Sequence, residues 1–324
     1  MSINLVLENA PTEVAGALFD FSALPGARAV SVVSQGEDYV LARIDSTGPS
    51  YLPIGPALIP GLAQGRRSFE RAVLSSLGNG GFALVAPEGV VRWRSFDDEP
   101  RVFQRVDRFP RNEHGFSVGI AAGASSDECD AALVILREPQ VIYDVTRYAW
   151  LRFEDAAGTC RWEGLTPQGE PPWLAKEAFP IPPHYLSNPT LLGLLRPILF
   201  HASWRGGKLR VFVVGLQGNY ERWGMDYSIA AQVGNAGVTA TWVADENCFG
   251  TYSASGRYLV INPLRAGGPS RGASRLLDLE TGELHAVTMP RGLARFQIAD
   301  HADGLFWIRT RRGESLRLAT CRAL

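Results

Sequence analysis

The chain has 324 residues, of which 46% are hydrophobic, and this is enough to bury a sizeable core without disulfides. Its 32 Lys and Arg nearly balance its 33 Asp and Glu, so no global field draws it to nucleic acid or to an anionic membrane. The opening "MSINLVLENAPTEV" lacks the basic start and the longer apolar run of a signal peptide. We therefore expect a cytoplasmic protein that binds neither nucleic acid nor membrane.

The residue types that usually hold metals are scattered along the chain. Four cysteines, at 129, 160, 248 and 321, never form a CxxC pair, and the five histidines never pair at i, i+2 or i, i+4. The acidic clusters at 97–99, 127–130 and 245–247 lack the spacing of a calcium loop. We expect reduced, mostly buried thiols, no metal and no cofactor.

Short apolar runs bounded by Gly, Asp, Asn and Ser recur along the chain, which is the pattern of an all-β protein. In chain order, a turn residue precedes such a run at Gly36 ("EDYVLARI"), Gly81 ("FALVA"), Asp130 ("AALVILR"), Gly207 ("KLRVFVVGL"), Gly256 ("RYLVI") and Gly304 ("LFWIRTR"). The steps between these markers are 45, 49, 77, 49 and 48 residues. This rhythm, with a strand-like run before each marker and a second turn after it, predicts the blades of a β-propeller.

Two motifs in the best repeat resemble a known family. "YSASGRYLVI" (252–261) and "LLDLETGELHAV" (276–287) are similar to the turns of WD40-like and TolB-like β-propeller repeats. The resemblance is good over 242–312, looser over 28–137 and 195–226, and poor over 148–194. The resemblance implies the fold of a propeller blade and indicates no enzymatic activity. No blade ends in Trp-Asp, so the resemblance stops short of a true WD40 repeat.

We predict one propeller domain over residues 1–324. The last unit, 293–324, supplies three strands, and pairing of the N-terminal "INLVLE" in this blade would close the ring. The span from Gly36 to Gly304 corresponds to six or seven blades. Residues 148–165 are then a shortened seventh blade or an insertion, and seven blades are favoured.

The repeat fails at a proline-rich irregular connection, residues 166–197, whose eight prolines argue against a central strand. The segment carries residue types that make good contact anchors, namely Trp173, Phe179, His184 and Tyr185. We predict that these four residues bind a partner. The alternative is a loop that only covers the ring or a neighbouring blade.

Two histidines lie at or near the ends of predicted inner strands, which line the channel of a propeller. His201 ("LFHASW") and His301 ("IADHADG") are thus candidates for contact with a small ligand in the channel. The alternative for each is a structural histidine whose hydrogen bonds are satisfied. "GPSRG" (268–272) matches the nucleophile elbow, but it lacks the following helix, so we expect no catalytic residue there.

These observations favour a monomeric, non-catalytic propeller that binds another protein as a recognition, adaptor or inhibitory module. One version is an immunity protein that masks its partner's active site. The alternative is a lactonase-like or hydrolase-like propeller enzyme, or a small-ligand binder, with its site in the central channel. A third possibility is a scaffold within a larger assembly.

Overall fold

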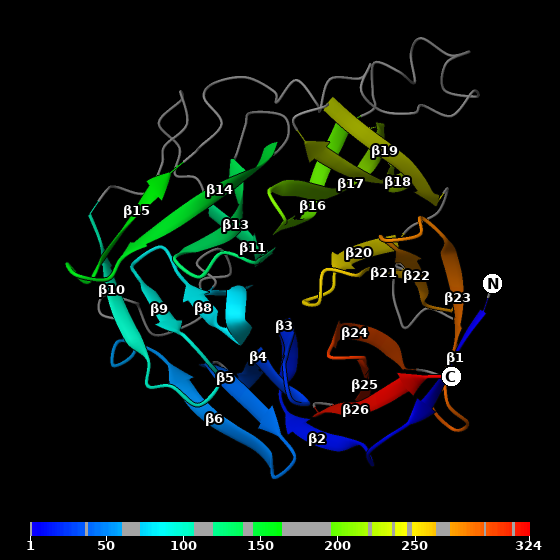
Figure 1. Ribbon diagram of the computed structural model, residues 1–324, viewed down its shortest axis with the longest axis horizontal. Helices are drawn as coiled ribbons and strands as arrows, with labels where there is room; N and C mark the ends of the chain where they lie inside the picture. The colour runs from blue at the N-terminus through cyan, green and yellow to red at the C-terminus, as the bar shows by residue number, and fades with distance from the viewer. Residues whose placement is uncertain are drawn as a thin grey trace.

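The chain folds into a ring of antiparallel sheets around a central channel (Figure 1). The structure is a computed structural model that describes residues 2–35, 38–59, 72–106, 119–138, 145–163, 196–219, 222–234, 237–244, 248–263, 273–294, 296–312 and 315–324. Within these ranges every regular element is a strand except one 3-10 turn, η1 (Gly78–Gly80). The prediction of an all-β propeller is confirmed.

The first three blades each contain four strands that follow one another outward from the channel, and blade 3 has an additional short strand, β12 (Ser125–Ser126). Blade 1 comprises β3 (Ala17–Leu24), β4 (Arg28–Gln35), β5 (Asp38–Asp45) and β6 (Gly48–Ile54). Blade 2 comprises β7 (Val73–Ser76), β8 (Phe82–Val85), β9 (Val90–Trp93) and β10 (Arg101–Arg105). Blade 3 comprises β11 (Gly119–Gly123) with the short β12 (Ser125–Ser126), then β13 (Ala131–Glu138), β14 (Val145–Glu154) and β15 (Thr159–Glu163).

The last three blades repeat this order. Blade 4 comprises β16 (Arg196–Arg205), β17 (Lys208–Asn219), β18 (Arg222–Gly234) and β19 (Gly237–Ala244). Blade 5 comprises β20 (Cys248–Tyr252), β21 (Tyr258–Pro263), β22 (Arg275–Asp278) and β23 (Leu284–Thr288). Blade 6 comprises β24 (Gln297–Ala302), β25 (Leu305–Arg312) and β26 (Ser315–Ala323), completed by β2 (Thr12–Ala15).

The N-terminal segment closes the ring, as predicted, but it does so with two strands. β1 (Ser2–Leu7) pairs antiparallel with β26 at Leu5–Leu7 and parallel with β23 of blade 5 at Ser2–Asn4. β2, which the sequence patterns did not indicate, runs along Ser315–Leu318 as the fourth strand of blade 6. The two chain ends therefore share one sheet, and β26 has a partner on both sides.

Six blades account for the strands of the described residues except β1, which bridges blades 5 and 6, so these residues do not confirm the preference for seven. The segment 148–165 is neither a separate blade nor an insertion where it is described. It contains most of β14 and all of β15, and β14 pairs with β13 along its full length. These two strands are the outer half of blade 3. The long step between Asp130 and Gly207 thus reflects the connection from β15 to β16, which leaves Pro197 inside the innermost strand of blade 4.

The sequence marker in blade 1 is displaced by one strand. Gly36 lies outside the described residues, and in sequence it falls after β4, the second strand, which ends at Gln35. The turn between the first and second strands contains Gly26, with φ of +77°. The inner strand is β3, "ALFDFSAL", whose apolar run is interrupted by Asp20. The run "RAVSVVS", which the pattern placed innermost, belongs to β4.

The second strand of each blade lies between two hydrophobic cores. In β21, Leu259 packs in the core shared with Phe212 of blade 4, while the next residue, Val260, packs in the core shared with Phe306 of blade 6. Residues of β8 likewise alternate between the cores shared with blade 1 and with blade 3. Because both faces of these strands are buried, the runs are continuously apolar.

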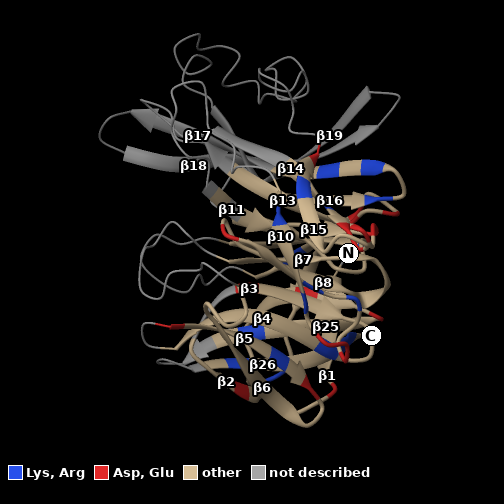
Figure 2. Ribbon diagram, turned by 90° about the vertical axis from the view of Figure 1, so that its left-hand side faces the viewer, with Lys and Arg blue, Asp and Glu red and all other residues tan. Residues whose placement is uncertain are grey.

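The two faces of the disc differ in their connections. Successive strands are antiparallel, so turns from first to second and from third to fourth strand lie on one side, here called the turn face. Connections between second and third strands and between blades begin and end on the opposite side, here called the loop face. Acidic and basic residues are interspersed along the side of the disc (Figure 2).

Candidate functional site

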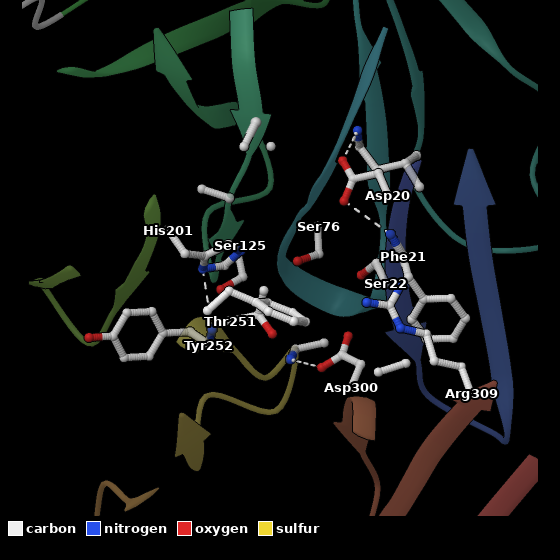
Figure 3. A pocket seen from close by; sticks show the side chains of 17 residues that line it. Asp20, Phe21, Ser22, Ser76, Ser125, His201, Thr251, Tyr252, Asp300 and Arg309 are labelled. Atoms are coloured by element: carbon white, nitrogen blue, oxygen red, sulfur yellow. Dashed lines mark hydrogen bonds between the residues drawn. The ribbon is translucent and has the colours of Figure 1, made fainter. Parts of the chain in front are cut away.

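The central channel contains a cavity of about 220 Å³ whose wall includes residues from all six blades (Figure 3). The innermost strands supply most of this wall, because they lie nearest the axis of the ring. Five ionisable side chains line the cavity: Asp20, His201, Tyr252, Asp300 and Arg309. Sequence reasoning singled out only His201 among them.

Asp20 joins blade 1 to blade 2. The residue follows an irregularity in the pairing of β3 with β4, which turns its side chain towards the channel. One carboxylate oxygen accepts a hydrogen bond from the amide of Phe21 (3.0 Å), and the other accepts one from the amide of Leu74 in β7 (2.8 Å). Burial raises the pKa of Asp20 to about 6, although both amides and nearby Arg309 favour the ionised form.

Asp300 connects three blades at one carboxylate. Its Oδ2 accepts a hydrogen bond from the amide of Ala23 in blade 1 (2.7 Å), and its Oδ1 accepts bonds from the amides of Ala254 in blade 5 (2.9 Å) and of His301 (2.7 Å). Burial raises the pKa of Asp300 to about 7, against the opposing effect of the three amides. The carboxylate is therefore fully engaged in holding the inner strands together.

His201 makes the equivalent link between blades 4 and 5. Its Nδ1 accepts a hydrogen bond from the amide of Tyr252 (3.2 Å), so the neutral ring carries its proton on Nε2. Burial lowers the pKa of His201 to about 4, which keeps the ring neutral at physiological pH. The structure thus places His201 in the channel and gives it a structural hydrogen bond.

Asp20, His201 and Asp300 occupy corresponding positions in their blades. Each follows a break in the register between the first and second strand, and each accepts an amide hydrogen from the next blade around the ring. Sequence reasoning missed the two aspartates, although an acidic residue within an apolar inner strand ("LFDFSA", "IADHA") is the signal that could have found them. The three side chains stabilise the interfaces between blades.

His301 does not line the cavity, because it follows Asp300 and its side chain points to the opposite face of β24. The ring is buried between Tyr258 (5.0 Å between centroids) and Phe306 (4.4 Å). Its Nδ1 forms a hydrogen bond with the hydroxyl of Ser255 (2.8 Å). Burial lowers the pKa of His301 to about 4, so it is a weak base, and among the described residues no carboxylate pairs with its ring. The low basicity of the ring makes it a poor acceptor for the hydroxyl proton of Ser255.

Arg309 and Ser22 face the cavity without the partners that buried polar groups normally have. Within the described part of the chain, the guanidinium of Arg309 forms no hydrogen bond or ion pair, and its nearest counter-charge is Asp20. Burial lowers the pKa of Arg309 to about 10, which still leaves it protonated. The hydroxyl of Ser22 is buried and also has no hydrogen-bond partner among the described residues.

Outside the central cavity, the His, Cys, Asp and Glu side chains of the described residues form no metal site. The groups of His, Cys, Asp and Glu in these ranges include no set of three that could hold a metal ion. None of the four cysteines forms a disulfide bond, and each except Cys129 is buried. A search of the described residues also finds no helix of the length and apolarity needed to cross a membrane.

The predicted partner-binding residues, Trp173, Phe179, His184 and Tyr185, lie outside the described residues, as does Ser270 of "GPSRG". The strands that flank the proline-rich connection are β15, which ends at Glu163, and β16, which begins at Arg196. Both of these strand ends lie on the loop face.

Comparisons with known proteins bear on the fold. No family model matches the chain, and no curated protein matches its sequence. Solved structures similar to this chain include the WD40 domain of coronin from Toxoplasma gondii (10% identity, TM-score 0.48, 100% of this chain and 87% of that one). They also include polysaccharide lyase Uly1 (10% identity, TM-score 0.49, 98% of this chain and 92% of that one). A third is an oligogalacturonate lyase from Vibrio parahaemolyticus (8% identity, TM-score 0.44, 99% of this chain and 97% of that one). The strand order itself establishes a β-propeller.

Proposed function

We propose that this protein is a non-catalytic recognition module that binds another protein through the loop face of the disc. The observation that carries the proposal is that the two faces of the disc differ in the lengths of their connections. Connections on the turn face contain two to seven residues, whereas those that join β6 to β7, β10 to β11, β15 to β16 and β21 to β22 contain 18, 13, 32 and 11. Long connections in a compact domain usually carry function.

The longest connection also has the composition of a binding segment. It contains Trp173, Phe179, His184 and Tyr185, and aromatic residues are enriched at the energetic centres of protein interfaces. The six blades supply a rigid base, since the inner strand of each blade contacts the neighbouring blades around the ring. A fixed platform with variable loops suits recognition because little order is lost on binding.

The channel offers less support for an enzyme. Asp20, His201 and Asp300 are the side chains there that would serve as acid, base or metal ligand, and each accepts an amide hydrogen from a neighbouring blade. Recruiting any of them would break a link between blades. We propose a monomer in the cytoplasm, and the immunity-like version, in which the partner's active site is masked, is one form of this function.

Affinity capture from a native lysate, with wild-type protein and two variants, tests the proposal. The binding variant carries Trp173→Ala and Tyr185→Ala, and the control variant carries Arg94→Ala and Asp97→Ala on the turn face. We expect the wild type and the control to retain the same stoichiometric protein and the binding variant to lose it. Retention of no such protein, or equal retention by all three, would contradict the proposal.

Metal analysis and light scattering complete the test. A tightly bound divalent ion at one per chain would favour the channel enzyme over the recognition module. Size-exclusion chromatography with light scattering should give the mass of one 35.3 kDa chain.

A further inference from the structure

We propose that the central cavity binds a small monocarboxylate, with the guanidinium of Arg309 as its counter-charge and the hydroxyl of Ser22 as a second donor. This site is independent of the partner surface proposed above. It rests on a cavity of defined size and on two donors that face it without partners in the described part of the chain, the buried hydroxyl of Ser22 and the partly buried guanidinium of Arg309.

Arg309 lies in β25, where it pairs with Gln297 of the inner strand and extends its side chain into the channel. A charge taken out of water needs a counter-ion or hydrogen bonds, and an isolated guanidinium there is costly. The nearest acid, Asp20, interacts with Arg309 electrostatically, but the two side chains form no ion pair. Both oxygens of Asp20 are held by amides, so it cannot turn to meet Arg309 without breaking the link to Leu74.

Ser22 supplies the second donor on the same side of the cavity. Figure 3 shows its hydroxyl and the guanidinium of Arg309 directed into the space between Asp20 and Asp300. A planar carboxylate suits the forked donors of arginine, and its second oxygen can accept from a hydroxyl. Both groups would then gain the partners that buried polar atoms usually have.

The size and lining of the cavity limit the ligand further. At about 30 Å³ for each water-sized group, 220 Å³ holds a molecule of about seven non-hydrogen atoms. Leu74, Phe249 and several alanines form apolar parts of the wall, which suits a short hydrocarbon tail. Asp20 and Asp300 disfavour a second negative charge, so a monocarboxylate is preferred over a dianion such as sulfate.

Isothermal titration calorimetry with sodium acetate, sodium butyrate and sodium sulfate, at constant ionic strength, tests the proposal. The variants are Arg309→Gln, which removes the counter-charge, and Arg322→Gln, a matched change on an exposed arginine of β26. We expect wild type and Arg322→Gln to bind butyrate with a 1:1 stoichiometry and more tightly than sulfate. Loss of a charged hydrogen bond should weaken butyrate binding to Arg309→Gln about ten- to a hundredfold.

Circular dichroism and thermal unfolding check that Arg309→Gln is folded. If it is not, Ser22→Ala replaces it, and we expect this smaller change to weaken butyrate binding about fivefold. The proposal would be overturned if the wild type shows no saturable butyrate binding, if sulfate binds equally well, or if the folded variant binds butyrate as tightly as the wild type.

Discussion

The carboxylate of Asp300 accepts a hydrogen bond from the amide of Ala23, 277 residues earlier in the chain, at 2.7 Å. This bond joins the inner strands of the last and first blades. It therefore closes the ring at the channel, while β2 closes it at the outer edge of blade 6. Asp300 also holds Ala254 of blade 5, so one buried side chain fixes the relative positions of three blades.

Replacing Asp300 should be costly. Asp300→Ala leaves the amides of Ala23 and Ala254 without their acceptor in a buried setting, and we expect it to lower the free energy of unfolding by about 3–5 kcal/mol. The measurement is urea unfolding followed by fluorescence. Asp303→Ala is the control, because Asp303 also accepts an amide from blade 1, that of Gly26, but at an exposed position. It should cost less than about 1 kcal/mol, and equal costs for the two variants would contradict this assignment.

The link made by His201 should make stability depend on pH. The folded protein holds the pKa of His201 at about 4, below its ordinary 6.5, so unfolding takes up a proton between these values. The stability that His201 contributes is therefore present above pH 6.5 and is lost as the pH falls towards 4.

The variant His201→Asn isolates this effect, because asparagine keeps an acceptor near the position of Nδ1 and does not titrate. We expect the unfolding free energy of the wild type to fall relative to the variant by about 2–3 kcal/mol between pH 7 and pH 4. Denaturant unfolding at several pH values measures the difference. A constant difference would show that the ring titrates normally in the folded protein.

Ring closure by β2 depends on Val14, which is fully buried against blade 6. Val14→Ala removes apolar contacts with the core that contains Trp307 and Leu316, and we expect a loss of about 2 kcal/mol in unfolding free energy. Glu13→Ala changes the adjacent, exposed residue of the same strand and should have an effect within about 0.5 kcal/mol. If both variants unfold like the wild type, β2 does not contribute to closure.

The turn at Gly256 should not tolerate a side chain. Its φ is +72°, and a Cβ atom there would collide with the side chain of Arg205 from blade 4. Arg205 donates to the carbonyl of Ala254, so its displacement would break a contact between blades. Gly282 has a similar φ, +75°, with no atom near the position of a Cβ. We expect Gly282→Ala to cost about 1 kcal/mol and Gly256→Ala about 1–2 kcal/mol more, measured by thermal unfolding.

Residue patterns could predict the second strand of most blades, because a strand covered on both faces must be continuously apolar. "YLVI" and "FALV" are strands β21 and β8 for this reason. The inner strand of blade 1 escaped prediction because Asp20 interrupts its apolar run. One of its carboxylate oxygens is satisfied by an amide 54 residues away, and no local pattern records such a partner.

Only part of the channel lining could be predicted from the sequence. His201 could be predicted as a channel residue, because a histidine at the end of an inner strand must face the axis or a core. His301 could not be placed by this argument, since a shift of one residue exchanges the two faces of a strand. Arg309 lies in a second strand, which gave no reason to expect it at the axis.

The apolar character of β21 on both faces has a consequence for how the strand finds its alignment. If β21 slid by one residue, Leu259 and Val260 would exchange cores, and each would still be buried among apolar side chains. Hydrophobicity alone therefore leaves the alignment of this strand undecided. The turn before it decides: the amide of Gly256 donates to the carbonyl of Ser253, and the amide of Tyr258 donates to the Ser253 hydroxyl. In this propeller the hydrogen bonds of the polar turn fix the alignment of β21 with β20.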